Sequence, residues 1–522
     1  MGQLHLEIPH LRKAHGATQL MVQGQPLLLL GGEVRNSVAS DKEALEAAFD
    51  RFVGLGANTA SVPISWELIE PAEGQFDFWQ LDMVLQAARA RGLHLVLLWF
   101  GMWKNALSSY VPEWVKTDLQ RFPRAQNKAG KNTMAVSALS EQAIVADARA
   151  YAVLLGHLRQ VDGAAHTVVM MQVENETGLL GSARDQNPLA QAAFAGAVPN
   201  ELTKYLETYR DDLGAELAMA WADAGRKAAG TWTEVFGAMA DEAFMAWQVA
   251  RATGRVAQAG KDVYPLPAFA NAWLIWTNDR PGQYPSGGPV MRVLDIWRAA
   301  APAIDMLAPD IYLEDFRAVC ADFHSRGNAL LIPEARPDER AAVTSLYAIG
   351  KHDALCFAPY ALEDVEATHP IAATYEAIAS LMPKIMELQG TGRMTALLQQ
   401  KAKEKAEVVL GNYRAKIEFT QPMTDVAQPM SGGKLPAVPG GALVLAVTGD
   451  AFIIIGLGVS FEFLSQDAKR PNAEFLAVDE GCFQEGQWVQ KRRWNGDESG
   501  HGRWLNLPGR LTVVKVRVHC YE

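Results

Sequence analysis

Residues 168–178 read VVMMQVENETG, an apolar run that ends in two carboxylates flanking an asparagine. A continuous apolar run of this length is typical of a buried parallel strand. An unpaired carboxylate inside a core is costly, so the charged end of the strand is expected to open into a cleft. Catalytic groups of an α/β barrel occupy this position, at the carboxyl ends of its strands.

A second stretch ends in the same way. Residues 329–336 read ALLIPEAR, which places Glu334 after an apolar run and Arg336 two residues further on. Two carboxylates at two strand ends of one barrel suit a glycosidase, in which a retaining pair lies roughly 5–5.5 Å apart. A nearby arginine favours an ionised nucleophile, and a neighbouring carboxylate favours a protonated acid. A structural Glu–Arg ion pair is the alternative for this stretch.

Side chains alternate along a strand, so Glu174 and Glu176 are expected to share the face that points to the barrel axis. Glu176 then lies nearer the top and reaches substrate. Glu174 lies one layer lower and needs a partner, for which Arg35 is the candidate. The alternative is that both carboxylates are solvated loop residues beyond the strand.

The length and charge limit the possible classes of protein. A chain of 522 residues fits a barrel plus one smaller domain. The formal net charge of −11 argues against nucleic acid or an anionic membrane as a partner, because both require a basic face. No stretch reaches the roughly 18 apolar residues of a membrane-spanning helix. The N-terminus lacks a signal-peptide pattern, so the protein either stays inside the cell or has lost its signal; the compartment is left open.

We expect neither a cofactor nor a bound metal. Phosphate-loop and dinucleotide fingerprints are absent, and His10, His15 and His94 lack metal-ligand spacing. The four cysteines are too scattered for a disulfide scaffold. Cys482 and Cys520 either pair with each other or remain free thiols.

Strand-like and helix-like patterns alternate through residues 1–388, which predicts a (β/α)8 barrel. The expected strands cover residues 27–30, 59–66, 93–100, 168–173, 268–276, 306–312, 329–336 and 354–360. Expected helices include residues 41–56, 81–91, 140–159 and 375–388. Residues 179–262 exceed one crossover, and their helical patterns at 200–228 and 233–252 indicate an insertion beside the cleft.

Residues 389–522 predict a smaller antiparallel β domain of sandwich type, because β-branched and aromatic runs recur between Gly, Pro and Asp turns. These runs are residues 407–410, 416–420, 442–447, 451–455, 461–464, 488–493 and 511–518. Residues 421–441 are expected to form a long connection, and residues 401–405 a solvated helix face.

Residues 172–176, QVENE, resemble the Gln-x-Glu-Asn-Glu motif of glycoside hydrolase family 35, the β-galactosidases of clan A. A block upstream is similar to the same family: Asn58-Thr59, Trp66, Glu70-Pro71, Gly74 and Phe76-Asp77-Phe78. The resemblance covers about residues 25–380. It implies that Glu176 is the acid/base, that Glu334 is the nucleophile and that Asn175 binds the sugar 2-hydroxyl.

Three departures fall on loops that hold the terminal sugar in the family. They are Glu67 after Trp66, residues 101–105 (GMWKN), and residues 31–35 (GGEVR), which contain Glu33 and Arg35. The pattern is similar to a divergent bacterial branch with a C-terminal β domain, some of whose members trim galactosyl side chains from plant polysaccharide fragments.

The resemblance thus implies a retaining exo-β-galactosidase that acts on oligosaccharides. Tyr312 is expected to hold Glu334 in its ionised form, and Trp66, Trp103 and Trp273 are candidate stacking platforms, with core packing as the alternative for each. The alternatives for the whole chain are another clan A β-glycosidase, either family 42-like or a β-glucosidase, and a carbohydrate-binding barrel without catalysis. The presence of both glutamates argues against the last. The oligomeric state and the leaving group stay open.

Overall fold

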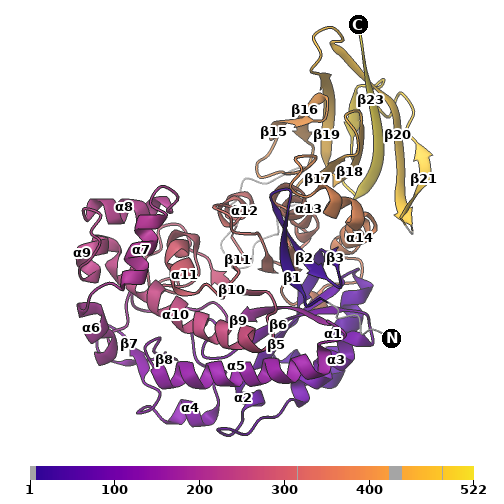
Figure 1. The fold of residues 1–522 in the computed structure, drawn as a ribbon. Helices are drawn as coiled ribbons and strands as arrows, with labels where there is room; N and C mark the ends of the chain where they lie inside the picture. Colours follow the sequence, from indigo (N-terminus) through magenta and orange to yellow (C-terminus); the bar gives the residue numbers. More distant parts are fainter. Residues whose placement is uncertain (1–6, 314, 422–437, 485) are drawn as a thin grey trace.

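Eight parallel strands close into a barrel in the computed structural model, which describes residues 7–313, 315–421, 438–484 and 486–522 (Figure 1). Around the barrel the order is β10-β11-β12-β13-β4-β5-β6-β9. The predicted (β/α)8 fold is confirmed. The strands are β4 (Leu29–Glu33), β5 (Thr59–Ser65), β6 (His94–Phe100), β9 (Val168–Val173), β10 (Ala268–Trp273), β11 (Met306–Ile311), β12 (Ile332–Ala335) and β13 (Cys356–Pro359).

Helices surround the barrel because each buries one apolar face against the strands. In the first of them the Asp41 carboxylate accepts a hydrogen bond from the Ala44 amide and caps the N-terminus, while Leu45, Phe49 and Phe52 form the buried face. The outer helices are α1 (Lys42–Gly54), α3 (Trp79–Arg89), α5 (Glu141–Asp162), α10 (Ala240–Val263), α11 (Leu294–Ala300), α12 (Phe316–Phe323), α13 (Ala341–His352) and α14 (Ile371–Leu388).

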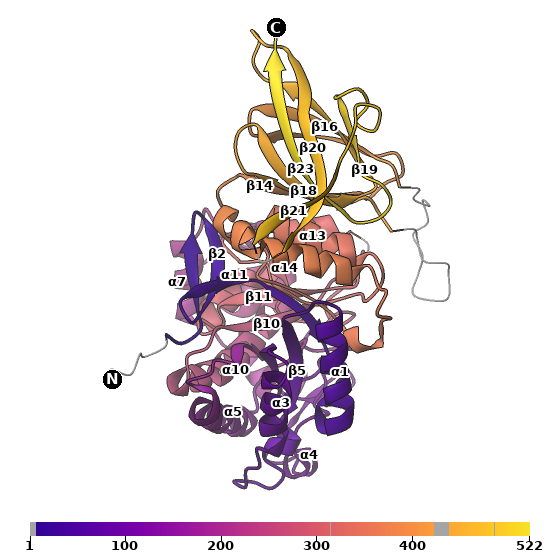
Figure 2. The same ribbon diagram turned by 90° about the vertical axis from the view of Figure 1, so that its right-hand side faces the viewer.

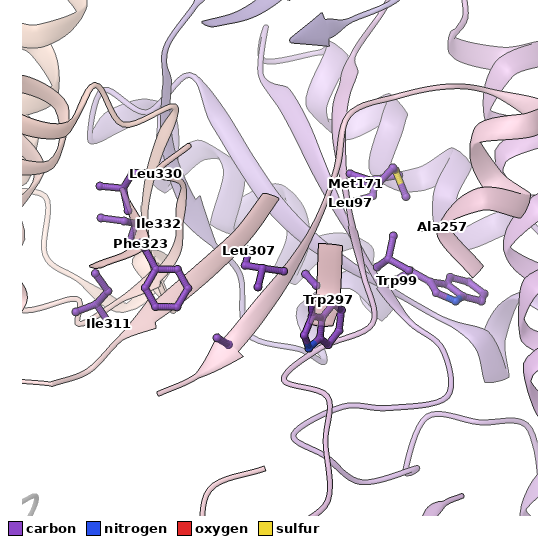
Figure 3. Packing of buried hydrophobic residues seen from close by; sticks show 14 of the residues in the cluster. Leu97, Trp99, Met171, Ala257, Trp297, Leu307, Ile311, Phe323, Leu330 and Ile332 are labelled. Carbon is purple, nitrogen blue, oxygen red and sulfur yellow. The ribbon is translucent and has the colours of Figure 1, made fainter. Parts of the chain in front are cut away.

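Two apolar clusters separate the inside of the barrel from its outside. The outer cluster packs strands against helices, as Trp99, Met171 and Trp297 do in Figure 3. The inner cluster fills the barrel and includes Leu29 and Phe100. Because side chains alternate, membership of one cluster or the other tells which way each strand residue points.

A three-stranded antiparallel sheet, absent from the sequence prediction, covers the amino-terminal end of the barrel. It consists of β1 (His10–Ala14), β2 (Ala17–Val22) and β3 (Gln25–Leu27). Leu20 and Val22 from β2 join the inner cluster, so they close the barrel from below. The expected first strand at residues 27–30 therefore began too early, since Leu27 belongs to β3.

The insertion between β9 and α10 is built from short helices that gather at one side of the barrel (Figure 1). They are α6 (Pro188–Ala195), α7 (Asn200–Thr208), α8 (Ala215–Asp223) and α9 (Trp232–Phe236). The expected helix at 200–228 is broken, because the chain turns through residues 209–214 between α7 and α8. Other loops carry α2 (Trp66–Ile69), α4 (Glu113–Thr117), β7 (Arg124–Gln126), β8 (Asn132–Val136) and the single turns η1 (Val38–Ser40), η2 (Gly237–Met239), η3 (Met291–Val293) and η4 (Leu362–Asp364).

Two antiparallel sheets follow the barrel. The six-stranded sheet has the order β14-β17-β18-β23-β20-β21, and the four-stranded sheet has the order β15-β16-β19-β22. Their strands are β14 (Met394–Leu398), β15 (Lys405–Leu410), β16 (Tyr413–Phe419), β17 (Gly441–Ala446), β18 (Ala451–Leu457), β19 (Val459–Ser465), β20 (Asn472–Gln484), β21 (Gln487–Arg493), β22 (Trp504–Asn506) and β23 (Thr512–Tyr521).

Some details of this region differ from the prediction. Residues 401–405 form a turn leading into β15 and not a helix. Most of the connection expected at 421–441 lies outside the described residues. All four cysteines are free. Cys520 lies opposite Ala473 and Cys482 opposite Val489, so the two thiols sit on different strand pairs and do not form the disulfide that was one alternative.

The six-stranded sheet rests on the helical side of the barrel, above α13 and α14 (Figure 2). Gly350 in α13 is the point of closest approach. A methyl group at this position would collide with Leu443 of β17 and would lie 2.8 Å from Cβ of Ala396 in β14. The expected boundary at residue 388 coincides with the last residue of α14.

The Gly350→Ala substitution tests this contact. Overpacking of a filled contact costs about 1–3 kcal/mol, so we expect the midpoint of denaturant unfolding to fall. Gly54→Ala is the matched control, because Gly54 also ends a helix segment but has no atom within 4 Å of the added methyl. Both variants gain the helix propensity of alanine, so a Gly350→Ala midpoint equal to that of Gly54→Ala would contradict close packing here.

Candidate active site

The chain departs from strand geometry at the end of β9. The strand stops at Val173, and Glu174 and Glu176 both adopt left-handed backbone, with φ of 63° and 45°. Such conformations cost about 1–3 kcal/mol for non-glycine residues and collect at functional sites. The expected alternation therefore fails here, and the two carboxylates do not share a face.

Glu174 lies behind the barrel wall against α5. Its carboxylate accepts hydrogen bonds from the Met102 amide at 3.2 Å and the Trp103 amide at 2.7 Å, and it shares a side-chain hydrogen bond with Asp147. Burial, followed by the charge of Asp147, raises the pKa of Glu174 well above its usual range. Two carboxyl oxygens can bond in this way only through a proton, so one of the pair is protonated.

Arg35 is not the partner of Glu174. It is exposed and pairs with Asp364, while its own amide donates to Glu363 at 2.8 Å. Arg35 therefore lies at the rim of the barrel mouth, and its contact with substrate stays a prediction.

The Asp147–Glu174 pair holds the loop that follows β6. Asp147 accepts hydrogen bonds from the Trp99 indole at 2.7 Å and from the Met102 amide at 2.9 Å. A methyl group on Gly101 would meet the Trp99 indole nitrogen and would lie 2.6 Å from Asp147. Glycine is thus required where the loop crosses this pair.

Glu176 points into the barrel mouth. Its Oε2 accepts a hydrogen bond from Nδ2 of Asn105 at 2.8 Å, and its amide donates to Asn271 at 3.0 Å. Asn271 in turn donates to Asp310 at 2.7 Å. Burial and then the charge of Glu334 raise the pKa of Glu176 to about 7, against the opposing charge of Lys104. Glu176 can therefore hold a proton near neutrality.

Glu334 lies near Glu176, at the end of β12. The pairing of β12 with β13 is irregular between Ile332 and Ala335, and both of these residues belong to the outer cluster. The irregularity separates them from Glu334, which contacts the site: Tyr312 donates to its Oε2 at 2.9 Å. Nδ2 of Asn175 lies 3.5 Å from its Oε1. Bulges of this kind often aim a side chain at an active site.

Arg336 donates to the backbone carbonyl of Tyr312 at 2.9 Å through Nε and at 2.6 Å through Nη2. It therefore fixes the segment that carries the Tyr312 phenol. Burial and then the charge of Glu334 raise the pKa of Tyr312 far above its usual range, so the phenol remains a hydrogen-bond donor.

Two buried charges complete the mouth. The Lys104 ammonium lies 4.8 Å from the centre of the Phe100 ring. Burial alone would lower its pKa, but the charges of Glu334, Glu33 and Glu176 raise it above the usual value. Glu33 ends β4 and is fully buried. The prediction missed Lys104 and Asn105, because residues 101–105 carried no signal beyond their difference from the family motif.

Two of the three predicted tryptophan platforms belong to the core. Trp66 is fully buried and donates to Glu70 at 2.9 Å, and Trp103 is buried and donates to the Val136 carbonyl at 3.2 Å. Neither indole offers a face to a sugar, so these two predictions are wrong. Trp273 is partly exposed and shares its strand face with Asn271, so its role as a platform stays a prediction.

Among the described residues, no group of three or more His, Cys, Asp or Glu side chains is arranged to hold a metal ion. No helix of that part of the chain is long and apolar enough to span a membrane.

Residues 37–224 match the model of glycoside hydrolase family 42, described as Beta-galactosidase. The chain is a glycoside hydrolase. The match contains β5, β6, β9 and Glu176, whereas Glu334 lies beyond it. It confirms the coarser expectation of a β-galactosidase-like hydrolase of clan A with a carbohydrate substrate, and it favours the family 42 alternative over the family 35 resemblance. Residues 371–506 of this glycosidase match a domain of unknown function, DUF5597.

Solved structures show the same fold as this glycosidase. Gan42B, a GH42 β-galactosidase from an organism abbreviated G., is 11% identical with a TM-score of 0.51, and the match covers 94% of this chain and 98% of that chain. The β-galactosidase from Bacillus circulans sp. alkalophilus is 11% identical with a TM-score of 0.48, covering 94% and 99%. That from the psychrophilic Marinomonas ef1 is 15% identical with a TM-score of 0.47, covering 72% and 63%. None of the curated proteins compared matches the chain.

The pKa of about 7 for Glu176 sets an expected pH profile. A general acid must be protonated in the free enzyme, so kcat/KM is expected to fall as pH rises through about 7. The Lys104→Met substitution removes a charge that lowers this pKa, so the alkaline limb should move to higher pH. Initial rates across pH measure the limb.

Lys491→Met is the control for this experiment, because Lys491 is exposed on β21, outside the barrel. It should leave the limb in place. A limb that stays fixed or moves to lower pH in Lys104→Met would contradict the coupling between Lys104 and Glu176.

Proposed function

We propose that this glycosidase is a retaining exo-β-galactosidase that releases terminal galactose from oligosaccharides derived from plant polysaccharides. The observation that carries the proposal is the pair of buried carboxylates at the ends of β9 and β12. Glu176 and Glu334 interact by charge, and the pKa of Glu176 is raised to about 7. A protonated acid beside a second carboxylate is the equipment of glycoside cleavage.

In the first step Glu176 protonates the glycosidic oxygen while Glu334 attacks the anomeric carbon. The bond to the leaving group breaks, and a covalent glycosyl–enzyme ester forms. In the second step Glu176 accepts a proton from water, which attacks the same carbon and releases the sugar and the Glu334 carboxylate. Two inversions give net retention of configuration.

Neighbouring groups support these roles. The Tyr312 phenol fixes one oxygen of Glu334 at 2.9 Å and leaves the other for attack. Oδ1 of Asn175 accepts from the Asn105 amide at 3.3 Å, which turns Nδ2 of Asn175 toward Glu334. The sugar 2-hydroxyl adjoins the anomeric carbon, so Asn175 is placed to bind it as the transition state forms.

Galactose and the plant-derived substrate rest on the family 42 match and on the motif of residues 172–176. A β-glucosidase would use the same two carboxylates and differ only in the sugar accepted. The raised pKa of Glu176 favours an enzyme over a binding barrel, because carbohydrate binding alone does not need a protonated carboxyl beside an ionised one.

Turnover of p-nitrophenyl β-D-galactoside tests the proposal. We expect wild-type activity, a loss of about 10²-fold or more in Glu176→Gln, and a loss of about 10⁴-fold or more in Glu334→Gln. Glu43→Gln, on the exposed start of α1, should match wild type. Activity confined to another aryl glycoside would reject the sugar, and full activity in either active-site variant would reject the mechanism.

Azide separates the two roles. Added to Glu334→Ala it should attack directly and give α-galactosyl azide. Added to Glu176→Ala it should attack the covalent intermediate and give β-galactosyl azide. The reverse pair of products would exchange the assignments of the two glutamates.

A further inference from the structure

Glu33 has a buried carboxylate that the fold itself does not satisfy. Its side chain has no exposed surface, and neither of its oxygens has a hydrogen-bond partner within the described part of the chain. Burying an unpaired carboxylate is expensive, and buried polar groups almost always have partners. An orphaned carboxylate at the mouth of an active site therefore indicates a partner that arrives from outside.

The strand directs Glu33 into the barrel. Leu29 belongs to the inner cluster, and a methyl group on Gly31 would lie 3.0 Å from Cβ of Ala358, which is another inner residue. A methyl group on Gly32 would instead meet Leu362 and Phe52, outside the barrel. Alternation therefore places Leu29, Gly31 and Glu33 on the inner face, with Glu33 in the top layer.

The strand order fixes where Glu33 lies relative to the reaction. Glu334 ends β12, and β13 separates this strand from β4, whereas β5 and β6 separate β4 from β9, which precedes Glu176. The anomeric carbon must face Glu334, and the leaving group must face Glu176. The edge of the sugar ring remote from the leaving group then turns toward β4.

The charges at the mouth restrict which sugars can enter. Burial, followed by the charge of Glu334, raises the pKa of Glu33, and the charge of Lys104 opposes this. Glu176 and Asp310 lie in the same group of interacting charges. Four carboxyl groups thus surround the Lys104 ammonium, and a fifth negative charge on the substrate would be repelled.

We infer that Glu33 selects the terminal sugar by accepting hydrogen bonds from the hydroxyls remote from the scissile bond, those at C3 and C4, in a subsite that takes neutral hexosides and rejects uronic acids. The inference rests on the proposed function, because it uses the assigned orientation of the sugar. The configuration at C4 separates galactose from glucose, so Glu33 would contribute to that choice.

Matched deoxy substrates test the inference. Wild type and Glu33→Gln are compared on p-nitrophenyl β-D-galactoside and on its 3-deoxy and 4-deoxy analogues. A hydrogen bond to a buried charged group predicts a loss of about 10- to 100-fold in kcat/KM for Glu33→Gln on the parent galactoside. On the analogue that lacks the bound hydroxyl, the variant should lose nothing further, because one contact cannot be removed twice.

Full multiplication of the two losses on both analogues, or wild-type kinetics in Glu33→Gln, would overturn the inference. Glu43→Gln is again the control, and equal unfolding midpoints show that Glu33→Gln is folded. p-Nitrophenyl β-D-glucuronide tests the charge rule: wild type should not turn it over, and measurable wild-type turnover would reject the neutral-sugar restriction.

Failure of the proposed function would look different. Wild type would then be inactive on the galactoside, and the same comparison would be made with the deoxy analogues of the aryl glycoside that is cleaved. With no turnover of any glycoside, binding of free galactose to wild type and Glu33→Gln is measured by calorimetry. Equal affinities in that measurement would overturn the role of Glu33.

Discussion

Repulsion between buried carboxylates is the constraint on which this active site depends. Glu33, Glu176, Asp310 and Glu334 interact across one barrel mouth, and the Lys104 ammonium lies among them. Burial removes the water that would screen these charges, so the arrangement is tolerable only if some carboxyls keep their protons. The same repulsion that makes the site costly also supplies the protonated acid that glycoside cleavage needs.

A second pair of carboxyls, outside the barrel wall, determines the shape of the mouth. Asp147 and Glu174 bind the backbone after β6 and so hold the loop that presents Lys104 and Asn105. The left-handed backbone at Glu174 and Glu176 turns consecutive side chains in different directions, one behind the wall and one into the cleft. A short sequence with three polar residues thus serves two layers of the protein.

Several parts of this arrangement could be predicted from sequence. Apolar runs ending in charge located Glu176 and Glu334, because a buried strand can carry charge only at its open end. Alternation failed for Glu174, because left-handed residues reverse the direction of a side chain and leave no signal in the pattern. The β1–β3 sheet was missed because its short strands mix polar and apolar residues. Trp66 and Trp103 have indole groups that bind Glu70 and the Val136 carbonyl, contacts between segments that no local pattern reveals. Lys104 became a site residue only through three-dimensional proximity.

The helix α14 belongs to both halves of the chain. Its Tyr375 phenol donates to the carbonyls of Gly31 and Phe357 at 2.9 and 2.8 Å, which ties it to the barrel strands β4 and β13. Yet the matched domain of unknown function begins at residue 371, the first residue of this helix. A gene fragment cut at that point would take with it the helix that seals the seam between the first and last barrel strands. The two units are therefore expected to have been inherited together and not exchanged as separate cassettes.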